Sequence, residues 1–138
     1  MATATITVTQ AKMDDKYNIT VNGIEFVLVE KGTFLMGAQN TDASLPNYST
    51  YASATTAPVH SVTIKKDFYI AKYELTQAQY EKITGNNTST TKGPNNPVEM
   101  VNWNDAQKYI AGLNAASGKT FRLPTEAEWE FAARGGLS

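Results

Sequence analysis

Three glutamates lie two residues apart near the end of the 138-residue chain, at Glu126, Glu128 and Glu130. Paired carboxylates act as an acid and a base when they converge across a cleft and differ in pKa. The spacing has a simpler explanation here. Glu128 follows Thr125 by three residues, as in a helix capping box. Glu130 precedes Arg134 by four residues, the spacing of an ion pair on one helix face. We therefore assign these glutamates structural roles and predict no catalytic residue among them.

The chain contains one histidine, His60, and no cysteine. His60 shares the predicted face of a strand with Val62 and Ile64, so we expect a packed or hydrogen-bonded histidine at the edge of the core and not a metal ligand or a base. The absence of cysteine excludes disulfides, thiolate metal ligands and thiol catalysis within this chain. Asp14–Asp15 and Asp42 match no calcium-binding loop, and we predict no metal site and no cofactor.

Residues 38–57 show neither strand nor helix periodicity, which predicts a long surface loop. The loop is rich in Tyr, Ser and Asn, which adaptable binding surfaces use because tyrosine offers a large contact area at low entropic cost. Two interpretations stay open, a solvated loop without a binding role and a loop that contacts a ligand. For the second, Asn47, Tyr48 and Tyr51 are the candidate ligand-binding residues, with a protein or a glycan as the ligand.

Composition narrows the range of partners. Twelve Lys and Arg residues stand against thirteen Asp and Glu, giving a net charge of −1, and they form no basic run. Proteins that bind nucleic acid carry a basic patch or stripe, so we expect no nucleic-acid partner. We also expect no membrane span, because no run approaches the roughly 18 apolar residues that cross a bilayer. The opening MATATITVTQ shows no signal peptide, which leaves the compartment open.

The N-terminal half has the pattern of an antiparallel sheet. Thr3–Thr9 alternates β-branched residues, typical of an exposed or edge strand, and a polar linker follows at residues 10–18. Asn22–Gly23 joins two β-rich runs and is a strong hairpin signal, since both turn residues tolerate positive φ. Alternating apolar residues between Pro58 and Ile70 predict two more strands.

Three segments of the C-terminal half carry helix start and stop signals. The predicted capping pairs are Thr76 with Gln79, Asn102 with Asp105, and Thr125 with Glu128. Gly85, Gly118 and Gly135 follow as stop residues. The expected buried faces are Tyr80 and Ile83 in the first helix, Ala106, Tyr109, Ile110 and Leu113 in the second, and Trp129, Ala132 and Ala133 in the third. We expect Trp103 and Trp129 to pack in the core.

Five segments, in this order and spacing, resemble the sulfatase-modifying-factor domain, that is, the formylglycine-generating-enzyme family. They are GTFLMG (Gly32–Gly37), PVHSVTI (Pro58–Ile64), FYIAKYELTQAQY (Phe68–Tyr80), PVEMVNWNDAQKYI (Pro97–Ile110) and FRLPTEAEWEFAARGG (Phe121–Gly136). The resemblance implies an α+β, C-type-lectin-like fold with a twisted antiparallel sheet and two main helices. It covers about Ile24–Gly136 and only the N-terminal portion of the family domain. We therefore treat residues 1–20 as a strand and linker, and 21–138 as a truncated family domain.

The resemblance implies several functions. The family's oxidases use a cysteine pair, copper and calcium to convert a sulfatase cysteine to formylglycine, and related sulfoxide synthases use iron and a histidine set. The resemblance places the oxidase ligands beyond Ser138. This chain has no cysteine and only His60 toward a histidine set, so we expect it not to be an enzyme as it stands. The first hypothesis is a non-catalytic ligand-binding or interaction module, which includes variable proteins of diversity-generating retroelements by family analogy. The alternatives are a partial member of the oxidase branch and an inactive truncated product.

Truncation has a consequence for partners. Missing strands would leave a sheet edge and apolar faces uncovered, and an unpaired edge invites pairing with another chain. We therefore expect self-association or a complementing fragment.

Overall fold

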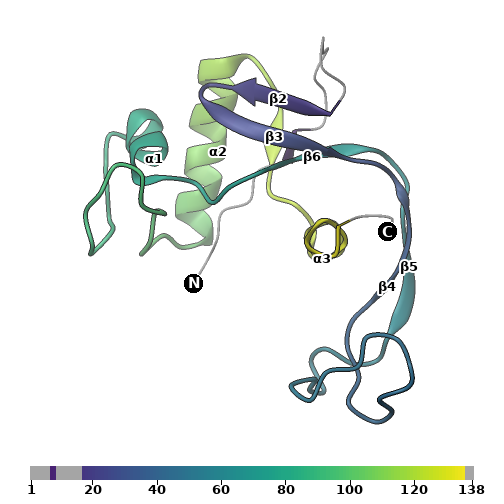
Figure 1. The fold of residues 1–138 in the computed structure, drawn as a ribbon. Helices are drawn as coiled ribbons and strands as arrows, with labels where there is room; N and C mark the ends of the chain where they lie inside the picture. Colours follow the sequence, from purple (N-terminus) through teal and green to yellow (C-terminus); the bar gives the residue numbers. More distant parts are fainter. Residues whose placement is uncertain (1–6, 9–16, 136–138) are drawn as a thin grey trace. The chain divides into compact units, whose positions relative to one another are not determined.

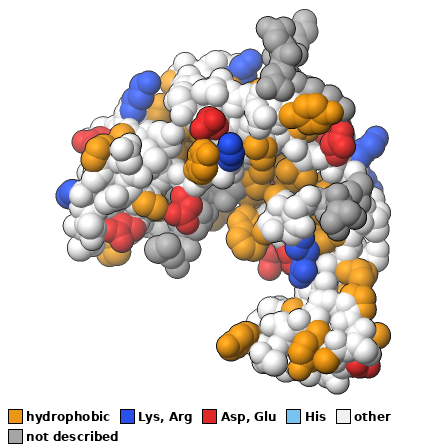
Figure 2. Space-filling view, viewed as in Figure 1, with side chains coloured by type: hydrophobic (Ala, Val, Ile, Leu, Met, Phe, Trp, Pro, Cys, Tyr) orange, Lys and Arg blue, Asp and Glu red, His pale blue; other side chains and the backbone are white. Residues whose placement is uncertain are grey.

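The computed structural model describes residues 7–8 and 17–135. The chain divides into two compact units: Met1–Val29 with Phe68–Pro124, and Glu30–Asp67 with Thr125–Ser138 (Figure 1). Most of the predicted strand Thr3–Thr9, nearly all of the predicted linker and Asp14–Asp15 lie outside the described residues. On the face shown in Figure 2, basic and acidic side chains are interspersed.

The first unit contains a five-stranded antiparallel sheet. Its strands, in spatial order, are β2 (Asn18–Val21), β3 (Ile24–Val29), β6 (Phe68–Ala71), β1 (Thr7–Val8) and β7 (Phe121–Arg122). Thr7 is paired with Ile70 on one side and with Arg122 on the other. The expectation of an edge strand is therefore wrong for Thr7 and Val8, the described part of this segment. Its alternation of β-branched residues could not reveal that a strand from the far end of the chain pairs with it.

The β2–β3 hairpin forms as predicted. Asn22 and Gly23 have φ angles of 50° and 77°, and the strands pair from Val21 with Ile24 onward. Both turn residues lie in the left-handed region, which Asn and Gly tolerate best. Ile24 and Phe26 are buried on one face of β3, as the two-residue period requires.

Helices α1 (Gln77–Thr84) and α2 (Trp103–Ser117) belong to the first unit, and both predicted capping boxes are confirmed. In each box the cap side chain accepts a hydrogen bond from the N3 amide, and the N3 side chain accepts one from the cap amide in return. Gly85 and Gly118 end the two helices with φ angles of 72° and 67°, the left-handed conformation expected of a glycine stop.

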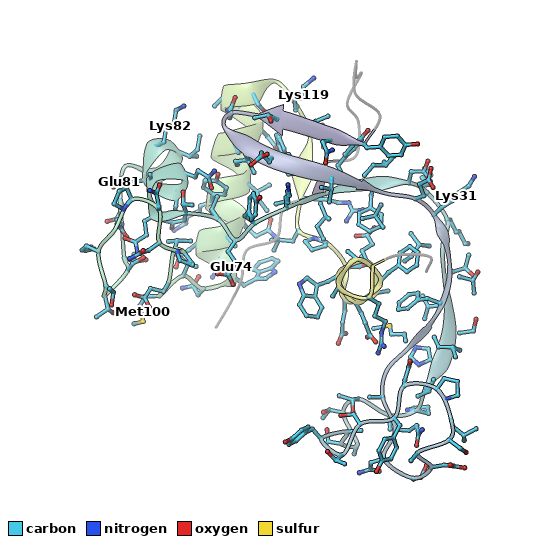
Figure 3. All side chains as sticks on the ribbon, viewed as in Figure 1. Lys31, Glu74, Glu81, Lys82, Met100 and Lys119 are labelled. Atoms are coloured by element: carbon cyan, nitrogen blue, oxygen red, sulfur yellow. The ribbon has the colours of Figure 1, made fainter. Side chains whose placement is uncertain are left out.

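The two helices and the sheet enclose the core of the first unit. Its buried residues are Ile24, Phe26, Leu75, Tyr80, Val98, Tyr109, Ile110, Leu113 and Phe121. The rings of Tyr80 and Tyr109 stack with their centroids 5.6 Å apart. Trp103, expected in this core, is 67% exposed, because it is the first residue of α2 and the buried residues of that helix begin at Tyr109. Met100 is exposed just before it (Figure 3).

Gln77 organises the loop after α1, and sequence periodicity gave no sign of it. The side chain is 1% exposed and donates through Nε2 to the carbonyls of Thr91 (2.8 Å) and Pro97 (3.3 Å). Its Oε1 accepts from Asn87 Nδ2 (2.9 Å) and from the Gly93 amide (3.1 Å). One buried amide thus satisfies backbone groups along a loop that has no regular structure of its own.

The second unit contains the hairpin of β4 (Gly32–Met36) and β5 (His60–Ile64), together with α3 (Glu126–Ala133). The predicted Thr125–Glu128 capping box is confirmed. The predicted buried stripe is wrong: Trp129 is 51% exposed, Ala133 is exposed, and Phe131 is the buried residue.

A neighbouring ring explains that choice of face. Phe131 packs against Phe34 of β4, with centroids 5.0 Å apart. Apolar residues occur on nearly every side of this eight-residue helix, so periodicity alone could not select the buried face.

Candidate ligand-binding site

A cavity of about 590 Å³ lies within the second unit, between α3 and the two ends of the 38–57 loop. Glu126, Trp129 and Glu130 line it from α3, and Arg134 lines it from the residue that ends this helix. His60, the first residue of β5, lines it as well. Small-molecule sites typically enclose about 300–1,000 Å³ with a few convergent polar groups, and this cavity has that size.

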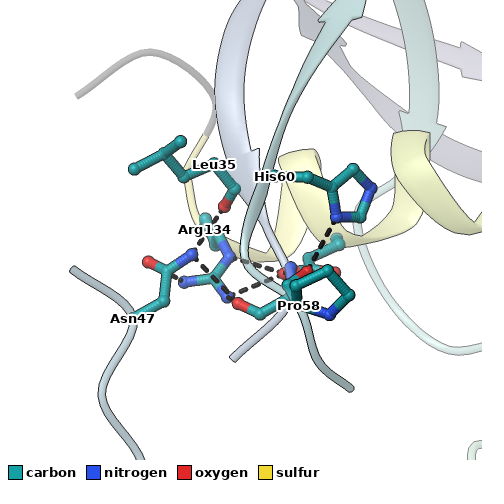
Figure 4. A network of polar contacts seen from close by, with 7 residues as sticks. Leu35, Asn47, Pro58, His60 and Arg134 are labelled. Carbon is teal, nitrogen blue, oxygen red and sulfur yellow. Dashed lines mark hydrogen bonds and ion pairs between the residues drawn. The ribbon is translucent and has the colours of Figure 1, made fainter. Parts of the chain in front are cut away.

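An ion pair at the end of α3 holds Gly37, the residue just before the 38–57 loop (Figure 4). Glu130 Oε1 accepts from Arg134 Nε at 2.9 Å and from Arg134 Nη2 at 2.7 Å, which confirms the predicted pair. The same oxygen accepts from the Gly37 amide at 2.9 Å. Arg134 Nη2 also donates to the Gly37 carbonyl at 3.1 Å. Charge-assisted bonds of this kind hold a fixed geometry, so they fix the start of the loop.

Asn47 closes the same network from the middle of the loop. Its Nδ2 donates to the carbonyls of Leu35 (2.7 Å) and Gly37 (2.9 Å), and its Oδ1 accepts from Arg134 Nη1 (3.3 Å). The residue has a φ angle of 59°, a left-handed conformation that Asn adopts more readily than most residues. The contacts that the structure shows for Asn47 are internal, and a contact with a ligand stays a prediction.

Tyr48 and Tyr51 are exposed to solvent, with 43% and 94% of their surface accessible. Neither lines the cavity, so the structure does not bring the three predicted ligand-binding residues together in it. The turn before them is held by Gln39, whose Oε1 accepts from the amides of Thr41 and Asp42, both at 2.9 Å. The loop lacks periodic structure as predicted, yet its backbone is hydrogen-bonded.

His60 is hydrogen-bonded, as one form of the prediction had it, but the residue is exposed and does not lie at the edge of the core. Its Nδ1 lies 2.9 Å from the Pro58 carbonyl oxygen. A carbonyl can only accept, so Nδ1 carries the proton and Nε2 of the neutral ring is left with an acceptor lone pair. With its ring neutral, His60 therefore contributes a hydrogen-bond acceptor to the cavity wall.

The cavity joins three short stretches that are distant in sequence, at residues 36–38, 55–60 and 126–134. Sequence analysis named none of its lining residues as ligand contacts, since local roles sufficed for His60 and for the glutamates, Trp129 and Arg134 of the third predicted helix. Within the described ranges, no group of three His, Cys, Asp or Glu residues could hold a metal ion. Over those same residues, no helix is long and apolar enough to cross a membrane.

The antiparallel strands, the three described helices and the order of the elements define an α+β domain of the C-type-lectin-like, formylglycine-generating-enzyme-like class. Residues 11–138 match the family model of the sulfatase-modifying factor enzyme 1-like domain. The chain belongs to this family, as its five motifs predicted.

Three known proteins illustrate the similarity. The chain is 34% identical to "Chaperone protein LppX" of Paenibacillus barcinonensis over 155 aligned residues, 86% of this chain and 48% of that protein. It is 40% identical to the formylglycine-generating enzyme of Thermomonospora curvata over 101 residues, 70% of this chain and 30% of that one. The solved structure of PvdO from Pseudomonas aeruginosa superimposes with a TM-score of 0.72 at 26% identity, over 91% of this chain and 53% of PvdO. The chain thus spans about half or less of each.

Proposed function

We propose that this chain is a non-catalytic ligand-binding or interaction module on a formylglycine-generating-enzyme-like scaffold, with the cavity beside Trp129 as its ligand site. The half-exposed indole of Trp129 on the cavity wall is the observation that carries the proposal. Covering a large aromatic surface is a strong source of binding energy, and tryptophan is enriched at binding hot spots. The Glu130–Arg134–Asn47 network supports it further, because a wall fixed before binding loses little entropy on binding.

The chemistry of the chain favours binding over catalysis. It contains no cysteine and one histidine, and the Glu130 carboxylate is engaged with Arg134 and Gly37. One relative bears the name of a chaperone, which makes a protein a reasonable class of ligand. The exposed Tyr48 and Tyr51 would then extend the contact area outside the cavity. A variable protein of a diversity-generating retroelement is a narrower form of this proposal and rests on family analogy.

The second candidate is a partial member of the oxidase branch, favoured by the relatives named formylglycine-generating enzyme. Its catalytic cysteines would lie outside these 138 residues. Mass spectrometry of a cysteine-containing sulfatase peptide, incubated with copper, oxygen and the protein, separates the two. Conversion of cysteine to formylglycine by a longer product of the same gene would establish the oxidase.

The binding proposal is tested by NMR on the two tryptophan indole N–H signals. Trp103→Phe assigns them, since only Trp103 and Trp129 are present. We expect members of a panel of neutral amides, monosaccharides, organic cations and carboxylates to shift the Trp129 signal and to leave Trp103, which does not line the cavity, unchanged. If no compound of any charge shifts the Trp129 signal, the cavity is not a ligand site.

A further inference from the structure

We propose that the cavity of the second unit recognises an organic cation, namely a guanidinium or ammonium group carried by its ligand. This inference rests on the proposed function, because it names the ligand chemistry of the same site. It follows from which groups on the cavity wall remain available once the internal hydrogen bonds are accounted for.

Trp129 and Glu126 supply the two attractive elements. They stand three residues apart on α3, so their side chains are neighbours on one helix surface, and both line the cavity. The face of an indole attracts a cation through the ring quadrupole, and tryptophan is the best residue for this contact. A carboxylate beside the ring supplies the opposite charge to the same group. Among the described residues, Glu126 is exposed and makes no hydrogen bond or ion pair, so its oxygens remain available.

His60, the first residue of β5, also lines the cavity and adds an acceptor when its ring is neutral. Because Nδ1 donates to the Pro58 carbonyl, the lone pair of Nε2 is available to an N–H donor of the ligand. Guanidinium and ammonium groups are donors without acceptors, and they match a wall that offers a carboxylate and an imidazole nitrogen.

Arg134 does not oppose this charge. Four hydrogen bonds engage its guanidinium, two to Glu130, one to Asn47 and one to the Gly37 carbonyl. An arginine has five N–H donors, so little donor capacity is left for an anion. Glu130 neutralises its charge at 2.7 Å, and Glu126 leaves the cavity wall with one net negative charge when the imidazole is neutral. The balance therefore favours a cation over a carboxylate or a sulfate.

Matched probes test this choice. N-acetyl-arginine amide and N-acetyl-lysine amide each carry one positive charge, and their citrulline and ε-acetyl-lysine counterparts keep nearly the same shape without it. We expect the two cationic probes to shift the Trp129 indole signal in a saturable way, and the two neutral probes to bind at least about fivefold more weakly.

Two glutamate variants separate a local effect from a general charge effect. Glu126→Gln removes the cavity carboxylate and should weaken the cationic probes about fivefold. Glu81→Gln makes the same charge change on an exposed residue of α1 that does not line the cavity, and it should leave the affinity unchanged (Figure 3). Circular dichroism checks that both variants are folded.

The outcomes distinguish this inference from the proposed function. If charged and neutral probes bind alike, or if sulfate shifts the Trp129 signal while the cations do not, the site exists but does not select a cation. Equal weakening by Glu126→Gln and Glu81→Gln would also overturn the inference. If neither these probes nor the wider panel shifts the Trp129 signal, both the inference and the proposed function fail.

Discussion

Asn47 combines an unusual backbone conformation with a side chain that bonds two carbonyls, and substitutions can separate the two contributions. Asn47→Gly keeps the left-handed conformation but removes the amide, so we expect a loss of about 1–2 kcal/mol in the free energy of unfolding. Asn47→Ala should cost roughly 1 kcal/mol more, because alanine is strained at positive φ. Urea denaturation monitored by tryptophan fluorescence measures both. Equal losses in the two variants would show that the backbone conformation carries no cost here.

Tyr109 contrasts with the hydrogen-bonded Asn47: its buried hydroxyl has no hydrogen-bond partner among the described residues. Leaving a polar group buried and unpaired costs about 1–3 kcal/mol, so Tyr109→Phe should keep or raise the free energy of unfolding. Tyr80→Phe is the matched control. Tyr80 is also a buried tyrosine, but its hydroxyl is not among the buried polar atoms left without a partner in the described part of the chain, so that variant should be neutral or destabilising. A clear loss of stability in Tyr109→Phe would show that the hydroxyl has a partner.

The same tyrosine gives a pH dependence. Burial raises the pKa of Tyr109 far above its ordinary value. In the unfolded chain a tyrosine ionises near pH 10, so above about pH 10 the unfolded state loses a proton that the folded state keeps. The contribution to stability is therefore present below that pH and is lost as the pH rises. We expect Tyr109→Phe to reduce the fall in melting temperature between pH 9 and 11. If the melting temperature of Tyr109→Phe falls as much as that of the unchanged protein, other groups, such as Tyr80, cause the alkaline sensitivity.

At the scale of elements, Gln77 links α1 to the loop that follows it through four hydrogen bonds. Gln77→Ala leaves those backbone and amide groups unpaired in a buried site, and we expect a loss of about 2–4 kcal/mol. Amide hydrogen exchange should accelerate at Gly93 in particular. Glu81→Ala changes an exposed residue of the same helix and should alter stability by less than about 0.5 kcal/mol. Similar losses in both variants would contradict this role for Gln77.

Sequence predicted these elements where the cause is local. Thr76, Asn102 and Thr125 cap their helices as expected, because a capping box involves only four consecutive residues. The Asn22–Gly23 turn formed for the same reason. Predictions failed where a distant partner decides the outcome: Phe34 selects Phe131 and not Trp129 as the buried residue of α3.

The candidate site was the least predictable part of the chain. Its wall combines residues about 70 to 100 positions apart in sequence, and the pattern of any one segment carries no information about the others. The role of Asn47 was also hidden, since its residue type fitted a ligand contact as well as an internal one. The Glu130–Arg134 pair was predictable from its i, i+4 spacing, although its contact with Gly37 was not.

For the whole molecule, self-association remains a prediction. Several large apolar side chains are exposed, among them Met100, Trp103 and Trp129 at 71%, 67% and 51%. Exposed apolar surface commonly marks an interaction site. We expect light scattering to give a mass of a dimer or larger that rises with protein concentration, together with a cooperative melt by circular dichroism. A monomeric mass at all concentrations, with the same cooperative melt, would contradict the prediction.

The segment 30–67 begins and ends at paired positions of the chain. Val29 of β3 lies opposite Phe68 of β6, and the Lys31 amide donates to Asp67 Oδ1 at 2.8 Å immediately beyond that pair. Strand pairing therefore already holds the two ends of the segment together. For a closed flexible loop, each doubling of length costs only about 0.6 kcal/mol. Insertions between residues 38 and 57 that leave Gln39 and Asn47 in place should consequently be inexpensive, and this loop can gain length while the register of β3 and β6 is unchanged.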